Sequence, residues 1–334
     1  MMFNSPHTAV EESPLQTIRS LLSNDLRAVD QVIISQLVSH IPLIKQMTEY
    51  ILSAGGKRMR PMILLLCARA LSSEKNAAIQ LSAVIELIHT ATLLHDDVVD
   101  HSTLRRGHQT AHVIWGSASS VLVGDYLYSR AFQIVVDMHH QTILDEFAKA
   151  THYIAEGEIL QLVNCHNPDT TEAFYFDIIQ RKTAKLFEIA AVLPALLDQK
   201  TQDCILPLQT FGKHIGLAYQ LTDDALDYSH SSEQIGKNIG QDLLEGKPTL
   251  PLIYAMHQCE KDVLPLLQEA IRQGVNDHLD DIVRTIESTH AIQYTLSLAN
   301  DHAGYAKEAL ADLPPSSYRD TLYALCDFVV NRTY

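Results

Sequence analysis

The sequence predicts an all-α protein that forms a single large helical domain. Helical periodicity runs through the chain, and strand-like alternation bounded by turn residues is hard to find. Several long segments are apolar almost all round, such as residues 77–95, which is typical of a central helix in a large bundle. No composition shift or long linker divides the 334 residues, so we expect one domain over 1–334, with residues 1–14 flexible.

The predicted helices follow one another with short turns between them. Breaks fall where turn residues cluster, in SAGGKRMRP (53–61), HNPDTTE (166–172), GKNIGQDLLEGKP (236–248) and ADLPPSS (311–317). Gly55 and Gly56 suit the end of one helix, and Pro61 suits the first turn of the next. The apolar spacing predicts helices near residues 15–39, 43–54, 61–72, 77–101, 117–139, 142–163, 171–198, 203–230, 248–258, 261–273, 278–287, 290–311 and 316–331.

The overall composition excludes some classes of function. Asp and Glu outnumber Lys and Arg by 40 to 25, and the net charge of −15 disfavours nonspecific binding to nucleic acid. The N-terminus shows no secretory signal, and no apolar run is long enough to span a bilayer, so we expect a soluble cytoplasmic protein. The 5 cysteines are scattered along the chain, which fits a reducing compartment better than a disulfide framework.

A pattern of three aspartates occurs twice, each time after apolar helical sequence. DDVVD spans residues 96–100 and DDALD spans 223–227, and in both the first and last aspartate fall on one helix face, about 6 Å apart along the axis. A single such pattern is most often a solvated acidic surface, but two copies in apolar helices indicate carboxylates that need cations. Oxygen ligands without His or Cys favour Mg²⁺ bridging to substrate phosphates, with the two clusters facing each other across a cavity.

Basic residues lie close to both acidic patterns or in turns between helices. Each alone would be an ordinary surface charge, and the turn at 55–61 could be a plain helix connection. Together with two acidic clusters they predict a site for two polyanions, one bound through metal and one bound directly by Arg and Lys. These basic residues are Lys57, Arg58, Arg60, Arg105, Arg106, Lys182, Lys237 and Lys247.

Several stretches between about residue 50 and residue 255 carry a family resemblance. They are GGKRMRPM, ELIHTATLLHDDVVDHSTLRRG, SVLVGDYLYSRAF, AEGEILQL, KTAKLFE, YQLTDDALDY and GKNIGQDLLEGKPTLPL. On these stretches the sequence resembles the trans-isoprenyl (polyprenyl) diphosphate synthases, and within them the long-chain bacterial type. Gln241 departs from the family pattern, which often has Asp there, but Asp242 stands beside it.

The resemblance implies an all-α fold with a central cavity, present as a homodimer. It also implies three Mg²⁺ ions held against an allylic diphosphate by Asp96, Asp97, Asp100, Asp223, Asp224 and Asp227. Asp96, Asp100 and Asp223 would be the usual direct ligands, and Asp97 and Asp227 would complete the metal site.

The same resemblance divides the remaining residues between two substrates. The allylic diphosphate would contact Arg105, Lys182 and Lys237, with Lys247 as a further cation. Isopentenyl diphosphate would be bound through its diphosphate by Lys57, Arg60, His89 and Arg106. Outside the family context, His89 could equally be a satisfied core histidine. Thr183 and Gln220 would lie near the allylic cation.

The predicted reaction breaks an allylic C–O bond and leaves diphosphate and a carbocation. Cations would stabilise the departing diphosphate, and amide and hydroxyl oxygens would surround the carbocation while water is excluded. The double bond of isopentenyl diphosphate then attacks, and a proton is lost. No Glu or His is obviously placed as the base, and in the family the departing diphosphate is thought to take this proton.

Product length depends on how the helices pack. Ala91 lies five residues before Asp96, about 7.5 Å along the helix axis, and its small side chain would leave a tunnel open, although an ordinary packed alanine is equally expected. Ile134, Val135 and Met138 on a facing helix could form the tunnel floor. By resemblance we expect an octaprenyl chain built on farnesyl diphosphate for a quinone such as ubiquinone, with transient membrane contact when the product leaves.

Other enzymes and a non-enzymatic protein share parts of this pattern. A terpene cyclase would usually lack GGKRMRP and the second aspartate cluster, because it binds one diphosphate. A non-catalytic subunit of a heteromeric synthase would be expected to lose metal-site aspartates, all of which are present. A shorter-chain synthase, making farnesyl or geranylgeranyl diphosphate, remains the more serious alternative.

Overall fold

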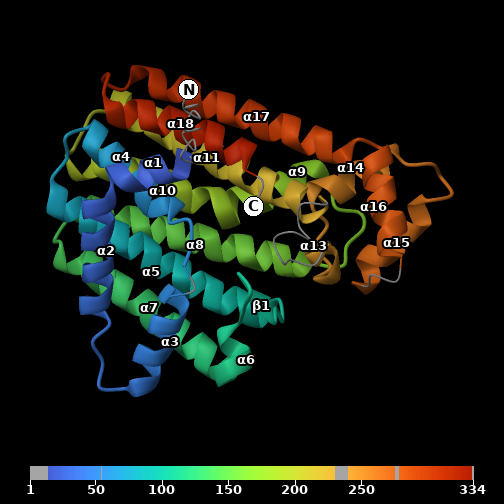
Figure 1. Ribbon diagram of the computed structural model, residues 1–334, viewed down its shortest axis with the longest axis horizontal. Helices are drawn as coiled ribbons and strands as arrows, with labels where there is room; N and C mark the ends of the chain where they lie inside the picture. The colour runs from blue at the N-terminus through green and yellow to red at the C-terminus, as the bar shows by residue number, and fades with distance from the viewer. Residues whose placement is uncertain (1–13, 54, 230–239, 275–277, 333–334) are drawn as a thin grey trace, which may run out of the picture.

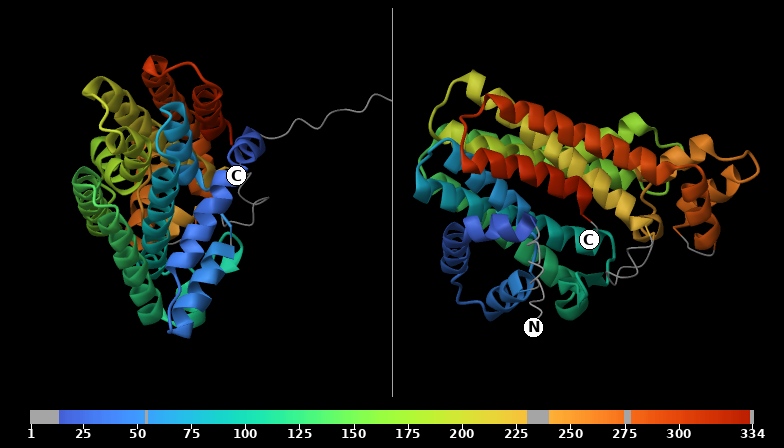
Figure 2. Two further views of the ribbon diagram at one scale, coloured as in Figure 1. Left: turned by 90° about the vertical axis from the view of Figure 1, so that its left-hand side faces the viewer. Right: turned by 45° about the horizontal axis from the view of Figure 1, so that its top comes forward.

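The computed structural model describes residues 14–53, 55–229, 240–274 and 278–332 and confirms the all-α fold (Figure 1). Long helices run side by side along the long axis of the molecule, and shorter helices cover their ends (Figures 1 and 2). The long helices are α5 (Lys75–Val99), α7 (Ser117–Asp137), α8 (Gln141–Asn164), α11 (Gln202–Asp227) and α17 (Ala291–Ala309).

The N-terminal part differs from the predicted elements in two places. Residues 15–39, predicted as one helix, form α1 (Pro14–Leu21) and α2 (Ser23–Gln36), because the backbone at Leu22 leaves helical geometry, with φ −98° and ψ 9°. Pro14 therefore belongs to a helix, while residues 1–13 lie outside the described ranges. Helices α3 (Pro42–Ser53) and α4 (Met59–Ala70) match the prediction within a few residues.

Three short elements between α5 and α7 were not predicted. Strands β1 (Leu104–Arg105) and β2 (His108–Gln109) pair antiparallel, and α6 (Ala111–Trp115) follows them. Elements of this length contain too few residues to show a period of their own. The hairpin places Arg105 and Arg106 directly beyond the end of α5, which carries the first aspartate cluster.

The predicted helix at 171–198 contains a change of helix type. It divides into α9 (Glu172–Ile179), a π-helical turn η1 (Gln180–Ala184) and α10 (Lys185–Leu197). Such π turns frequently occur at functional sites, and η1 carries Lys182 and Thr183. The remaining elements are α13 (Gln241–Leu244), α14 (Leu250–Gln258), α15 (Leu264–Gln273), α16 (Leu279–Ser288), the 3₁₀ turn η2 (Leu310–Asp312) and α18 (Ser317–Asn331).

The main hydrophobic cluster packs α5 against α2, α4, α7 and α10, and α10 packs in turn against α11. Two smaller clusters surround α14–α16 and the α9–α11 contact. Among the described residues, α5 alone is long and apolar enough to cross a membrane, and 67% of its most apolar window is buried inside the protein. Its lack of a polar face therefore reflects its place in the core. All the cysteines are free thiols, and Cys67 and Cys326 are buried.

Candidate active site

The two aspartate clusters lie near the ends of α5 and α11, and two lysines that contact the first cluster line a pocket together with Asp224 of the second. Lys182, in η1, places its Nζ 3.7 Å from Oδ2 of Asp96. Lys247, beyond α13, places its Nζ 2.6 Å from Oδ2 of Asp100. Both lysines line, together with Asp224 of the second cluster, a pocket with about 590 Å³ of open space. The lysines that contact the first aspartate cluster thus line the same pocket as an aspartate of the second cluster.

Each of these lysines is also paired with a glutamate. Nζ of Lys182 lies 2.6 Å from Oε2 of Glu158 on α8, and Nζ of Lys247 lies 2.6 Å from Oε2 of Glu245. Burial alone would lower the pKa of both lysines, but the surrounding carboxylates raise both pKa values above the ordinary lysine value. Both ammonium groups therefore stay charged at neutral pH and offset the repulsion among the carboxylates.

Asp224 is the most deeply buried acid of the second cluster, and protein donors occupy both of its oxygens. Tyr175 Oη donates a 2.5 Å hydrogen bond to Oδ2, and Gln220 Nε2 donates a 2.7 Å bond to Oδ1. Gln220 Oε1 in turn accepts a 2.8 Å bond from Thr183 Oγ1. Burial raises the pKa of Asp224 well above its ordinary value, and the charge of Asp242 adds to the effect.

The other two aspartates of the second cluster contact different groups. Oδ2 of Asp227 accepts a 3.1 Å hydrogen bond from the backbone nitrogen of Asp242. Oδ1 of Asp223 lies 3.2 Å from Nη1 of Arg332, whose side chain is only 1% exposed. The Arg332 guanidinium also donates to the carbonyl oxygen of Tyr219 at 2.7 Å and lies 4.0 Å from the centre of its ring. Arg332, which directly follows α18, thus links the C-terminal helix to the second aspartate cluster.

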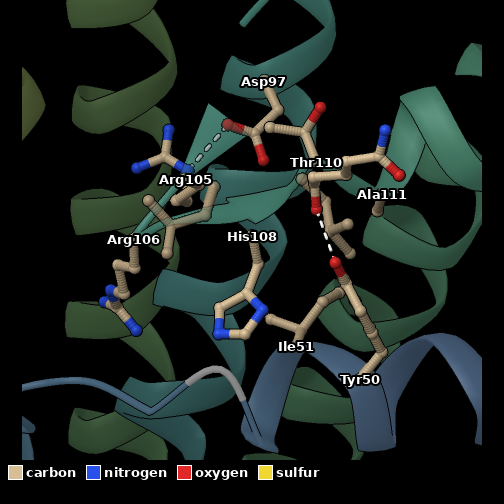
Figure 3. A pocket seen from close by; sticks show the side chains of 11 residues that line it. Tyr50, Ile51, Asp97, Arg105, Arg106, His108, Thr110 and Ala111 are labelled. Atoms are coloured by element: carbon tan, nitrogen blue, oxygen red, sulfur yellow. Dashed lines mark hydrogen bonds and ion pairs between the residues drawn. The ribbon is translucent and has the colours of Figure 1, made fainter. Parts of the chain in front are cut away.

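Asp97 contacts a different group from its neighbours in the first cluster. Its Oδ1 accepts a 2.7 Å hydrogen bond from Nε of Arg105 in β1 (Figure 3). Burial raises the pKa of Asp97, and the charge of Arg105 works in the opposite direction. The pair borders a second pocket, which Tyr50 and Arg106 also line (Figure 3). Asp97 therefore holds the hairpin arginine, whereas the lysine contacts involve the other two acids of the cluster.

Arginines surround His89 on α5. Nη1 of Arg60 lies 3.2 Å from Nε2 of His89, and the Arg60 guanidinium lies 4.4 Å from the centre of the Phe187 ring. Burial lowers the pKa of His89 well below its ordinary value, and the charges of Arg60 and Arg106 lower it further. His89 is therefore neutral near pH 7, and its Nε2 accepts from an arginine, which can only donate.

The glycine turn before α4 lets further cations approach this histidine. A Cβ on Gly56 would lie 2.7 Å from Nη1 of Arg106, so only glycine allows the two to pack this closely. Arg58 lies 2.9 Å from Oε1 of Glu86, on α5, and Lys57 is half-buried beside it. The positive charges of Arg58 and Arg106 both lower the pKa of His89. This basic cluster suits an anion bound directly by side chains.

The donor set of the two aspartate clusters suits a hard cation, but side chains alone do not close a metal site. Within the described ranges, no three His, Cys, Asp or Glu side chains converge closely enough to hold an ion. Mg²⁺ usually combines one or two carboxylates with substrate phosphates and water. The residues therefore fit a divalent ion together with a phosphate ligand between α5 and α11.

The residues predicted to set chain length lie along the α5–α7 pair. Ala91 is fully buried in the main hydrophobic cluster, as are Ile134 and Val135 on α7. Met138, directly after α7, is half-buried against the same cluster. The two helices lie side by side and run antiparallel (Figures 1 and 2), so these positions lead away from the aspartates along one helix interface.

Some residues of the site carried little or no signal in the sequence. Glu158 lies within AEGEILQL, one of the stretches that carry the family resemblance, so that stretch could have identified it. Tyr175 and Arg332 are single residues far from the acidic patterns along the chain, and only the fold brings them there. Lys237, predicted to contact the allylic diphosphate, lies outside the described residues.

Comparisons with known proteins identify the family of the chain. A family model described as polyprenyl synthetase matches residues 41–287. Octaprenyl diphosphate synthase of Escherichia coli (strain K12) is 44% identical over 319 residues, covering 95% of this chain and 99% of that protein. All-trans-nonaprenyl-diphosphate synthase (geranyl-diphosphate specific) of Rhodobacter capsulatus is 42% identical over 319 residues, covering 95% and 98%.

A solved structure resembles the whole fold. The crystal structure of polyprenyl synthase from Caulobacter crescentus CB15, complexed with calcium and isoprenyl diphosphate, has a TM-score of 0.92 and 40% sequence identity. The similarity covers 96% of this chain and 98% of that one. With a family model over most of its length and relatives matched nearly end to end, this chain belongs to the polyprenyl synthetase family of trans-prenyltransferases.

Proposed function

We propose that this single-domain protein condenses isopentenyl diphosphate units onto farnesyl diphosphate and makes all-trans octaprenyl diphosphate for a quinone side chain, in the cytoplasm. The observation that carries the proposal is the pocket lined by residues of α8, α9, η1, α11 and α13 and by Lys247. Aspartates of one cluster contact Lys182 and Lys247, which line it together with an aspartate of the other cluster. A basic cluster surrounds His89, which lies on α5 seven residues before Asp96. Two anion sites of different chemistry are what a two-diphosphate reaction requires.

The allylic diphosphate would lie between the aspartate clusters. Lys182 and Lys247 would contact its oxygens directly, and Arg105 would approach from the hairpin, held by Asp97. These cations would stabilise the charge that develops as the allylic C–O bond breaks. The contacts of the two lysines with Asp96 and Asp100 keep both ammonium groups at the pocket before substrate arrives.

Asp96, Asp100, Asp223 and Asp227 would hold Mg²⁺ on this diphosphate. When bound, Mg²⁺ would supply Lewis-acid stabilisation of the leaving group. Support comes from the oxygen-only donor set and from the absence of a closed metal site in the described part of the chain, which a diphosphate would complete. Asp97 and Asp224 would instead orient Arg105 and Gln220.

Isopentenyl diphosphate would bind at the basic cluster. Arg60, Arg106 and Lys57 would contact its diphosphate, and neutral His89 would donate a hydrogen bond to it or to a neighbour. The stacking of Arg60 on Phe187 keeps one face of the guanidinium dry and directs its edge toward an anion. Binding without metal would leave the double bond free to approach the allylic carbon.

The allylic cation would form next to Thr183 and Gln220. Both line the pocket, and the oxygen of the Gln220 amide is electron-rich but a poor nucleophile. Ile178 and Ile179, which line the same pocket, would help to keep out water, which would otherwise capture the cation. The departing diphosphate would then accept the proton that is lost.

Support for a long product comes from Ala91 and from the relatives named above. Ala91 is small and buried, and it would obstruct a chain growing along α5 less than a bulky residue would. A shorter-chain synthase remains the second candidate, because a short-chain isoprenyl diphosphate synthase of Methanothermobacter thermautotrophicus is also 33% identical over 291 residues. A non-catalytic subunit is disfavoured, since both clusters keep all their aspartates.

A homodimer would cover apolar side chains that the chain leaves exposed on neighbouring helices. They are Val121 and Leu122 on α7 and Ile159, Leu162 and Val163 on α8. Exposed apolar patches of this kind mark interaction surfaces. Light scattering at micromolar concentration should then give twice the chain mass of 37.3 kDa.

The deciding assay supplies labelled isopentenyl diphosphate, farnesyl diphosphate and Mg²⁺ to the purified protein and separates the products by chain length. We expect octaprenyl diphosphate, and no product when a chelator removes the metal. Products that stop at farnesyl or geranylgeranyl diphosphate would support the shorter-chain alternative. No elongation under any of these conditions would refute the synthase function.

A further inference from the structure

A series of hydrogen bonds runs along one wall of the pocket that Lys182, Lys247 and Asp224 line. Tyr175 Oη donates to Oδ2 of Asp224 at 2.5 Å, and Gln220 Nε2 donates to Oδ1 at 2.7 Å. Thr183 Oγ1 then donates to Gln220 Oε1 at 2.8 Å. All four residues line the same pocket, so the series ends where a substrate would lie.

Asp224 decides which end of the Gln220 amide faces Thr183 and the substrate. Oδ1 of Asp224 accepts from Nε2 of Gln220, so the amide turns its NH₂ group toward Asp224 and its oxygen toward Thr183. A Gln220 side chain turned by half a rotation would present the positive end of its amide dipole instead. Beside a developing carbocation, the oxygen stabilises the charge and the NH₂ group opposes it.

Tyr175 in turn holds the carboxylate of Asp224. Its ring is buried in the hydrophobic cluster that joins α9 to α11, so the hydroxyl has little freedom to move. It occupies Oδ2 and leaves Oδ1 for the amide of Gln220. Without this hydroxyl, the carboxylate could rotate about its last side-chain bond, and a buried oxygen would lose its donor.

We propose that Tyr175 is a positioning residue for prenyl transfer. Acting through Asp224, it keeps the carbonyl oxygen of Gln220 directed at the allylic carbon. The inference rests on the proposed function, because it requires an allylic cation in this pocket. Tyr175 itself makes no contact with the reacting atoms, so its removal should affect the chemical step more than the binding of isopentenyl diphosphate.

The test is the Tyr175→Phe variant of the full chain, assayed with farnesyl diphosphate, isopentenyl diphosphate and Mg²⁺. We expect kcat to fall about tenfold or more, as it does when groups that orient a functional residue are lost, with little change in KM for isopentenyl diphosphate. In a Gln220→Leu background, Tyr175→Phe should cause little further loss, because the amide through which it acts is gone.

Tyr294→Phe is the matched control. It removes a hydroxyl that donates to Glu172 at 3.1 Å, also on α9 but away from the pocket wall described above, and kcat should not change. Thermal unfolding of each variant separates a loss of fold from a loss of orientation. A tenfold fall in kcat with an unchanged unfolding midpoint supports the positioning role.

Two results overturn the inference: a wild-type kcat in Tyr175→Phe, or an equal loss with and without the Gln220 amide. If Tyr175→Phe does not fold, Asp224→Asn tests the same point, because an Asn amide can donate to Gln220 and permit the reversed orientation. A wild-type kcat in that variant also overturns it. Failure of the proposed function looks different, since the wild-type protein would then give no elongated product.

Discussion

Replacing Ala91 by tyrosine should shorten the product from a long polyprenyl chain to farnesyl or geranylgeranyl diphosphate. Ala91 is fully buried on α5, five residues before Asp96, which places the two about 7.5 Å apart along the helix axis. A chain that grows from the aspartates along α5 would meet the new ring within its first few isoprene units. The tunnel assignment therefore predicts an early stop.

The geometry of α7 shows how much of the tunnel this substitution would remove. Ser120 Oγ donates a 3.0 Å hydrogen bond to the carbonyl oxygen of Leu94, which sets the two antiparallel helices level at that point. Val135 lies fifteen residues farther along α7, and Asp96 lies two positions beyond Leu94 in the opposite direction, so Val135 and Asp96 are about 25 Å apart along the helix axes. A tyrosine ring that blocks the tunnel about 7.5 Å from Asp96 leaves the growing chain roughly a third of this length.

The assay compares product chain lengths from wild-type protein, Ala91→Tyr and Ala91→Val under the same conditions. Valine is the control for added bulk, and it should give products longer than those of the tyrosine variant. If Ala91 lies in a closed core, tyrosine costs about 1–3 kcal/mol of unfolding free energy through overpacking and leaves the product length unchanged. A folded, active Ala91→Tyr enzyme that still makes the long product would refute the tunnel.

Three further predictions follow from the ion pairs of the site. Arg332→Ala should lower the free energy of unfolding in urea by about 1–3 kcal/mol. Most of this loss should come from the contacts with Tyr219, because the side chain of Asp223 is 41% exposed and solvent screens its ion pair. An unchanged free energy of unfolding would contradict a structural role for this arginine. The pKa of His89 is lower in the folded protein than in the unfolded chain, so the unfolded chain takes up a proton more readily below pH 6.5. The free energy of unfolding therefore falls as pH drops below that value, by up to about 1.4 kcal/mol per pH unit. His89→Gln should flatten the pH dependence of the unfolding free energy below pH 6.5, and an unchanged slope would contradict the low pKa of His89. Calorimetry should show that Mg²⁺ binds far more tightly in the presence of inorganic pyrophosphate than alone. The reason is that Lys182 and Lys247 pair with the aspartates until a phosphate binds. Equal Mg²⁺ affinities with and without pyrophosphate would contradict this reasoning.

The long helices were predictable because their apolar residues repeat over many turns. The helix predicted at 77–101 is Lys75–Val99, and the one predicted at 203–230 is Gln202–Asp227 within the described residues. The hairpin and α6 are too short to show a period. The π turn at Gln180–Ala184 was also missed, because a π turn differs from an α-helix in its hydrogen bonds rather than in the kind of residue it contains.

The acidic residues of the site could be predicted because their spacing alone places them on one helix face. Their partners could not, because a spacing rule reaches only along one helix. Lys182 and Lys247 were predicted as cations, but which carboxylate each one contacts depends on the packing of η1 and α13 against α5. Tyr175 and Arg332 reach the second cluster from other helices, and an isolated Tyr or Arg resembles any other until the fold is known.

A chain with a net charge of −15 can bind two diphosphates because its cations are concentrated where the substrates would lie. In the pocket, Lys182 and Lys247 each sit between two carboxylates, so the aspartates are already partly neutralised before any ligand binds. A divalent ion that enters alone must compete with these ammonium groups. A diphosphate gives the lysines a new partner and frees the carboxylates for the ion, so each ligand should strengthen the binding of the other.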